Sequence, residues 1–166
     1  NQWDSIIDGV TKCQETGCYI LYDLTRLVGY SSQKPPNYLL IQKQVELLKE
    51  YDSILGWYLA DEPDGNNLHP DQVNQAYQLI KSIDPNRPVI ICLDTVNVVT
   101  SKNNWKPFLN AADIFILDIY PIDDDVKIYH TGNIISIGES IDLIKSYTDK
   151  SIWFAPQAFG GCEYYP

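Results

Sequence analysis

The chain has 166 residues, 45% of them hydrophobic, and a formal net charge of −10. Its length and composition fit one globular domain with its own core and exclude a disordered or fibrous chain, and no apolar run approaches the roughly 18 residues that cross a bilayer. The negative charge and the scattered lysines and arginines argue against nucleic acid, because phosphate binding relies on clustered basic residues.

Apolar spacing and breaker residues divide the chain into alternating helices and strands. Residues that recur every three or four positions predict helices, and short runs of branched and aromatic residues predict strands. In chain order we predict a helix over 6–13, a strand over 18–24, a helix over 40–51, a strand from 54 that ends before Pro63, a helix over 70–83, a strand over 89–94, a short helix over 105–111, a strand over 114–120, a helix over 134–144 and a strand over 151–159.

This alternation of strands and helices predicts the fold class. Each return to a parallel strand needs a crossover helix, so the class is α/β with a parallel sheet. Five such units could form a doubly wound sheet, but the chain starts on a helix and ends at Pro166 with no helix after its last strand. A complete barrel typically takes about 250 residues. We therefore predict a single catalytic-type domain over 1–166 that is a fragment of a larger (β/α)8 TIM barrel.

The four cysteines form no CxxC pair and no cluster with histidine. A structural zinc site is therefore not predicted. Cys92 lies in the apolar run VIICL and is predicted to be a buried thiol. Cys13 and Cys18 could form a disulfide in an oxidising compartment. The chain begins with Asn1 and no signal peptide is visible, but secretion stays open because the first residue need not be the natural start.

The stretch 54–64 is the strongest functional signal, because an aromatic-rich apolar run ends in two carboxylates and a proline. We predict a buried strand that carries Glu62 to its end, where Pro63 fixes the backbone direction. An acid at the C-terminal end of a parallel strand, beside Trp57 and Tyr58, lies where α/β enzymes place their chemistry. The alternative interpretation is a solvated turn between a strand and a helix.

Acids end four of the five predicted strands, and parallel strands bring these ends to one face of the sheet. The residues are Asp23, Asp61 with Glu62, Asp94 and Asp118, and the fifth strand reaches Gln157. One such acid often caps a helix, but several together predict a site. Because crowded carboxylates raise one another's pKa, one can stay protonated as a general acid while its neighbour is ionised. Glycoside hydrolysis needs this division of roles.

The order GWYLADEPDG, DPNRPVIICL, ADIFILDIYPI and WFAPQAFGG followed by CEYYP resembles the barrel-type glycoside hydrolase superfamily, over about the last two thirds of the chain. It is most similar to hydrolase-like proteins with Asp-Glu-Pro at the fourth strand and Pro-Gln-Ala-Phe at the seventh. The resemblance implies that the five strands are the third to seventh of a (β/α)8 barrel. It also implies that Glu62 is the acid/base of a hydrolase that acts on carbohydrate without a cofactor.

The second carboxylate has two candidates, because this chain departs from the better-known members of the superfamily. These have Asn before the acid/base and a second Glu on the seventh strand, where this chain has Asp61 and Gln157. The candidates are Asp118, at a strand end, and Glu163, in a loop. We place Asp118 first, because a strand end holds a side chain more firmly. Eight residues are predicted to bind the sugar: Asp23, Asp61, Trp57, Tyr58, Asp94, Tyr120, Gln157 and Phe159.

Two other functions fit the same residues. Asp23, Glu62, Asp94 and Asp118 could hold Mg²⁺ in a barrel enzyme of another class, for which EDTA would abolish activity. The missing glutamate on the seventh strand would instead fit a carbohydrate-binding protein without catalysis, and the fold alone does not decide between them.

Overall fold

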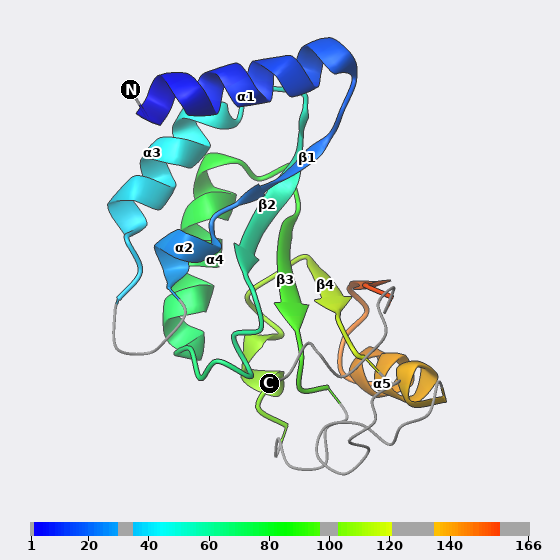
Figure 1. Cartoon of the computed structure of the whole chain (residues 1–166). Helices are drawn as coiled ribbons and strands as arrows, with labels where there is room; N and C mark the ends of the chain where they lie inside the picture. Colours follow the sequence, from blue (N-terminus) through cyan, green and yellow to red (C-terminus); the bar gives the residue numbers. More distant parts are fainter. Residues whose placement is uncertain (1, 30–34, 97–102, 121–134, 157–166) are drawn as a thin grey trace, which may run out of the picture.

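The computed structural model describes residues 2–29, 35–96, 103–120 and 135–156 (Figure 1). The strands are β1 (Ile20–Asp23), β2 (Ile54–Ala60), β3 (Val89–Leu93), β4 (Ile114–Leu117) and β5 (Ser151–Phe154). The helices are α1 (Gln2–Thr16), α2 (Thr25–Val28), α3 (Tyr38–Leu48), α4 (Pro70–Ile83) and α5 (Ile135–Lys145), with a short 3₁₀ helix, η1 (Lys106–Phe108). In this part of the chain, no helix has the length and apolar character needed to span a membrane.

The five strands form one parallel sheet in the order β1-β2-β3-β4-β5. A doubly wound sheet reverses its strand order at a switch point, whereas consecutive units of a barrel follow the chain order. The order here never reverses, so the fold is α/β and a partial (β/α)8 barrel, as the sequence predicts. The numbering of these strands as third to seventh, and the larger domain around them, stay predictions.

The hydrophobic core lies between the sheet and the helices that connect its strands. Figure 1 shows α2, α3 and α4 on the same side of β1, β2 and β3. Trp57 of β2 belongs to this core with no exposed surface. Its indole N–H donates a hydrogen bond to Asp84 Oδ2 at 3.0 Å, and its ring packs edge-on against Tyr22. The core therefore fixes β2 against the end of α4.

Local sequence signals explain where several helices begin and end. The side chain of Asn37 caps α3 by accepting a hydrogen bond from the amide of Leu40 at 3.1 Å. Gly17 follows α1 with a φ of +70°, a conformation that favours glycine. Pro70 is the first residue of α4, where its missing amide costs no hydrogen bond. The start of α4 matches the prediction, whereas α1 ends three residues later and α3 begins two residues earlier than predicted.

Other elements differ from the prediction. The helix α2 was not predicted, and the short helix expected over 105–111 is only the three-residue turn η1. The strands are shorter than expected, and residues 157–159 lie outside the described part.

Cys92 is 4% exposed, as predicted for a buried thiol. Cys13 and Cys18 are free thiols.

Candidate active site

Glu62 is positioned by backbone contacts just beyond the end of β2. Its amide donates a hydrogen bond to the carbonyl oxygen of Cys92 at 3.1 Å, and its own carbonyl accepts one from Asn66 at 2.8 Å. Its φ is +45°, in the left-handed region that residues other than glycine seldom adopt. Such a conformation costs free energy and is most often retained at functional sites. The turn around Glu62 is therefore held by its neighbours in a strained form.

Asp94 is held by the loop that follows β3. The buried Asp64 carboxylate accepts hydrogen bonds from the backbone amides of Asp94 at 3.3 Å and Thr95 at 2.8 Å, and from the Thr95 hydroxyl. A Cβ added to Gly65 would lie 3.1 Å from Asp94 Oδ2. Asp64 and Gly65, from the turn after Glu62, thus control where the Asp94 carboxylate can lie.

Asp118 follows β4 and is the most buried of the three acids. Its carboxyl group forms a hydrogen bond with the carboxyl group of Glu62, and the residue is 7% exposed. Its Oδ1 atom is buried and has no hydrogen-bond donor in the protein. A buried carboxylate oxygen without a donor is costly, so this atom needs a proton or a ligand from outside the chain.

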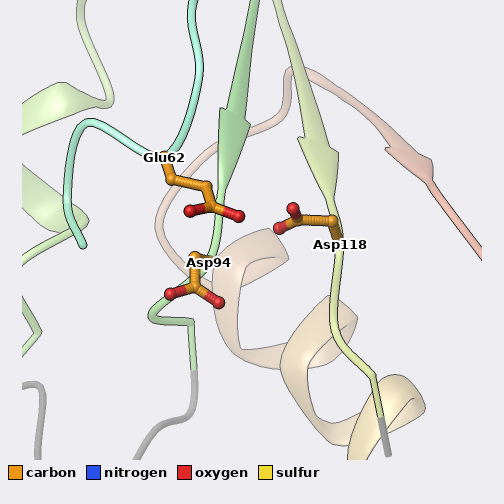
Figure 2. A group of neighbouring side chains, drawn as sticks. All are labelled: Glu62, Asp94 and Asp118. Carbon is orange, nitrogen blue, oxygen red and sulfur yellow. The ribbon is translucent and has the colours of Figure 1, made fainter. Parts of the chain in front are cut away.

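The carboxyl groups of Glu62, Asp94 and Asp118 form one cluster. One oxygen from each residue can be chosen so that all three oxygens lie within 4.8 Å of one another. Figure 2 shows the carboxyl groups of Glu62 and Asp118 facing each other, with Asp94 beside them. The residues follow β2, β3 and β4, which are neighbours in the sheet. The parallel strands therefore bring together three of the predicted site residues.

Burial and the neighbouring acids raise the pKa values of all three carboxyl groups. The pKa of Glu62 rises from 4.5 to about 7, first through burial and then through a side-chain hydrogen bond and repulsion from Asp118. Burial and the charge of Glu62 raise the pKa of Asp94 to about 6. Burial also raises the pKa of Asp118, while the hydrogen bond with Glu62 opposes this rise. Glu62 is thus the proton donor of the pair and Asp118 the acceptor.

Tyr58 and Asp61 lie next to this cluster and bind each other. The Tyr58 hydroxyl donates a hydrogen bond to Asp61 Oδ1, and Asp61 is exposed. Strand alternation predicts that Asp61 points away from Glu62, but β2 ends at Ala60, so the alternation does not apply there. Burial, with the nearby charge of Asp118, raises the pKa of the Cys92 thiol, so this cysteine is no thiolate nucleophile.

The remaining predicted site residues are not part of the cluster. Asp23 is exposed and accepts a hydrogen bond from the amide of Thr25, the first residue of α2, at 2.8 Å. Trp57 is fully buried on the helix-facing side of the sheet, where it cannot contact a sugar. Tyr120 is half-buried just after β4. Gln157, Phe159 and Glu163 lie outside the described residues.

Sequence reasoning missed the supporting residues Asp64 and Gly65. The pair Asp-Gly after Pro63 indicates a turn. The partners of Asp64, however, are 30 and 31 residues away in sequence, and no local pattern indicates them. Only the pairing of β2 with β3 brings these residues together.

No protein-family model matches the sequence, and no curated protein matches it. Among solved structures, a "putative beta-galactosidase" from Bacteroides fragilis aligns with a TM-score of 0.44 and 18% sequence identity. The alignment covers 78% of this chain and 19% of that one, so this chain spans about a fifth of that protein's length. A match at this level assigns neither a family nor a function to the chain.

Proposed function

We propose that this chain is a glycoside hydrolase domain that cleaves O-glycosidic bonds in an oligo- or polysaccharide. The observation that carries the proposal is the cluster at the strand ends, in which oxygens of Glu62 and Asp118 lie within 4.8 Å. A pair of carboxyl groups beside the scissile bond is the catalytic machinery of most glycoside hydrolases. The resemblance of the DEP, DIYP and PQAF segments to that superfamily supports the same function.

In this proposal Glu62 is the general acid. Its raised pKa, about 7, keeps a substantial fraction protonated at neutral pH. Glu62 gives this proton to the leaving oxygen as the glycosidic bond breaks, and Asp118 attacks the anomeric carbon to form a glycosyl ester. The ionised Glu62 then takes a proton from the water that hydrolyses this ester, which restores both groups. Glu163, outside the described residues, is the alternative partner.

The short distance between the two carboxyl groups favours retention of the anomeric configuration. Inversion needs a water molecule between them and a separation of about 6.5 to 9.5 Å, whereas retention needs about 5 to 5.5 Å. Oxygens of the two groups lie within 4.8 Å, which is closer to the separation for retention than to that for inversion. We therefore expect the first product to keep the configuration of the substrate.

An exposed tryptophan offers a surface for the sugar ring. Trp153 of β5 is 38% exposed and pairs in register with Ile116 of β4. Paired residues of neighbouring strands present their side chains on the same face of the sheet, so the indole shares a face with Ile116. Ile116 lies near the end of β4 that leads to Asp118, so the indole can stack on a pyranose beside that strand end. Tyr58 and Tyr120, both half-buried, complete the proposed binding residues.

The proposal is tested by turnover of the chain on a panel of α- and β-linked oligosaccharides, whose leaving oxygen needs a proton, with and without EDTA. We expect Glu62→Gln and Asp118→Asn each to lower kcat/KM by about 100-fold or more, as typical for the loss of a general acid. Asp71→Asn is the matched control, since it removes one charge from an exposed side chain on α4.

Three results would count against the hydrolase. Unchanged turnover in Glu62→Gln would remove Glu62 from the mechanism. Sugar binding without turnover on any substrate would favour the carbohydrate-binding protein. Turnover that requires Mg²⁺ and disappears in EDTA would favour the magnesium enzyme, which the same carboxylate cluster fits.

A further inference from the structure

We propose that Glu62, Asp94 and Asp118 form a binding site for a hard divalent cation, Ca²⁺ or Mg²⁺, and that the bound cation switches hydrolysis off. The cation site is argued from the geometry alone. The inhibition by the bound cation rests on the proposed function, because a cation can inhibit only an active hydrolase.

The distances within the cluster fit a single ion. Two oxygens bound to the same ion lie at most about 5.2 Å apart for Ca²⁺ and about 4.2 Å apart for Mg²⁺, given bonds of about 2.6 and 2.1 Å. The three carboxylate oxygens lie within 4.8 Å of one another. All three can therefore bind one Ca²⁺ after side-chain movements of a few tenths of an ångström, and one Mg²⁺ after larger ones.

The Asp118 carboxylate provides an independent reason to expect a ligand. Asp118 is 7% exposed, and its Oδ1 atom is buried without a hydrogen-bond partner. The group faces Glu62 across the centre of the cluster (Figure 2). Within the described ranges, the ion pairs lie elsewhere and none neutralises these three acids. A cation would supply both the missing partner and the missing positive charge.

Two of the three ligands are held in place by backbone contacts. The amide of Glu62 is bound to the Cys92 carbonyl, and the amides of Asp94 and Thr95 are bound to Asp64. A site whose ligands are already positioned loses less conformational entropy when the ion binds. The side chains of Glu62 and Asp94 therefore need little ordering to bind an ion.

The same contacts explain why an ion would stop the chemistry. A Glu62 carboxylate bound to a cation holds no proton to donate to the leaving oxygen. An Asp118 oxygen bound to the same cation is no longer a free nucleophile. Cation binding and hydrolysis therefore compete for the same two groups.

Binding is measured on the full chain, after EDTA treatment and dialysis, by calorimetric titration with CaCl₂ and separately with MgCl₂. We expect one ion per chain for at least one of the two cations. Asp118→Asn and Asp94→Asn each raise Kd by about tenfold or more, and Asp71→Asn changes Kd less than about twofold. Circular dichroism and thermal unfolding check that each variant is folded. Gly65→Ala, which crowds Asp94 Oδ2, is the second variant should either Asn variant fail to fold.

If no binding is detected at cation concentrations up to about 10 mM, the proposed site is wrong, because even the weakest calcium-binding modules bind more tightly than this. Equal weakening by Asp71→Asn would also overturn it, because binding would then reflect diffuse negative charge. For the switch, we expect saturating cation to lower turnover at least tenfold, with half of the effect at the measured Kd. Unchanged or increased turnover would overturn the switch. If turnover in EDTA requires Glu62 but no cation binds, the cation site is refuted and the hydrolase proposal stands. If a cation binds but no substrate is turned over, the hydrolase and the inhibition are refuted and the cation site stands.

Discussion

The backbone amide of Glu62 donates a hydrogen bond to the carbonyl oxygen of Cys92 at 3.1 Å, beyond the end of β2. This bond continues the pairing of β2 with β3, and the Glu62 side chain faces Asp118, which follows β4 (Figure 2). The contact between the two carboxyl groups thus depends on backbone pairing across three strands. Variants of the acids should therefore change the chemistry more than the fold.

Replacing Glu62 by Gln should make stability less dependent on pH. The folded chain raises the pKa of Glu62 from 4.5 to about 7, so the fold favours the protonated form. The stability from this group is fully present below about pH 4.5 and is lost as the pH rises through about 7. Gln does not ionise, so the variant avoids this loss. We expect Glu62→Gln to be the more stable protein at pH 8.

Urea unfolding of both proteins at pH 5 and pH 8 measures this difference. Acids outside the cluster contribute equally to both proteins, so the difference reports Glu62 together with its effects on Asp94 and Asp118. An equally steep fall in the free energy of unfolding for both proteins would show that Glu62 is not the group responsible.

Removing the Asp64 carboxylate should destabilise the fold. Asp64 is 2% exposed and binds the amides of Asp94 and Thr95 and the Thr95 hydroxyl. Asp64→Ala removes these three hydrogen bonds, each of which contributes about 0.5 to 1.5 kcal/mol to stability. We expect a loss of roughly 2 to 4 kcal/mol in the free energy of unfolding, measured by urea denaturation. Asp71→Ala, on the surface, is the control, and a loss no greater than the control's would contradict the role given to Asp64.

Adding a methyl group at Gly65 should disturb Asp94 more than the fold. The new Cβ would lie 3.1 Å from Asp94 Oδ2, so the carboxylate must move by a few tenths of an ångström. Gly65 is not among the residues with positive φ, so alanine suits its backbone. We expect Gly65→Ala to unfold within about 1 kcal/mol of wild type and to lower kcat/KM several-fold. Wild-type turnover with wild-type stability would show that the position of Asp94 is unimportant.

Hydrolysis should decline at alkaline pH if Glu62 is the general acid. Its pKa is raised to about 7, so the protonated fraction falls above this pH. We expect kcat/KM to fall about tenfold for each further pH unit, measured on the best substrate of the glycoside panel. Turnover that stays constant up to pH 9 would require a different acid.

The sequence predicts the fold and the centre of the site because both depend on repeated, local patterns. Alternating strands and helices predict a parallel sheet, and a parallel sheet brings its strand ends together. Glu62, Asp94 and Asp118 therefore gather as expected. Trp57 was expected at the site, yet it alternates with Tyr58 and so lies on the opposite face, in the core.

The other differences depend on contacts that no local pattern indicates. Asp23 ends β1 as predicted, but the helix α2 begins two residues later, and its first amide, that of Thr25, donates a hydrogen bond to the Asp23 carboxylate. The bonds between Asp64 and the loop after β3 join segments about 30 residues apart. Of the two candidates for the second carboxylate, Asp118 lies beside Glu62, and Glu163 lies outside the described residues.

The proposed mechanism depends on a protonated Glu62 that donates a hydrogen bond to Asp118, and the most direct test is a ¹³C NMR titration of the Glu62 side-chain carboxyl. We predict a pKa of about 7 in the wild-type chain. We also predict a lower pKa in Asp118→Asn, because an amide brings no charge and can donate a hydrogen bond to the ionised Glu62. A wild-type pKa near the usual 4.5, or one unchanged by Asp118→Asn, would contradict the account.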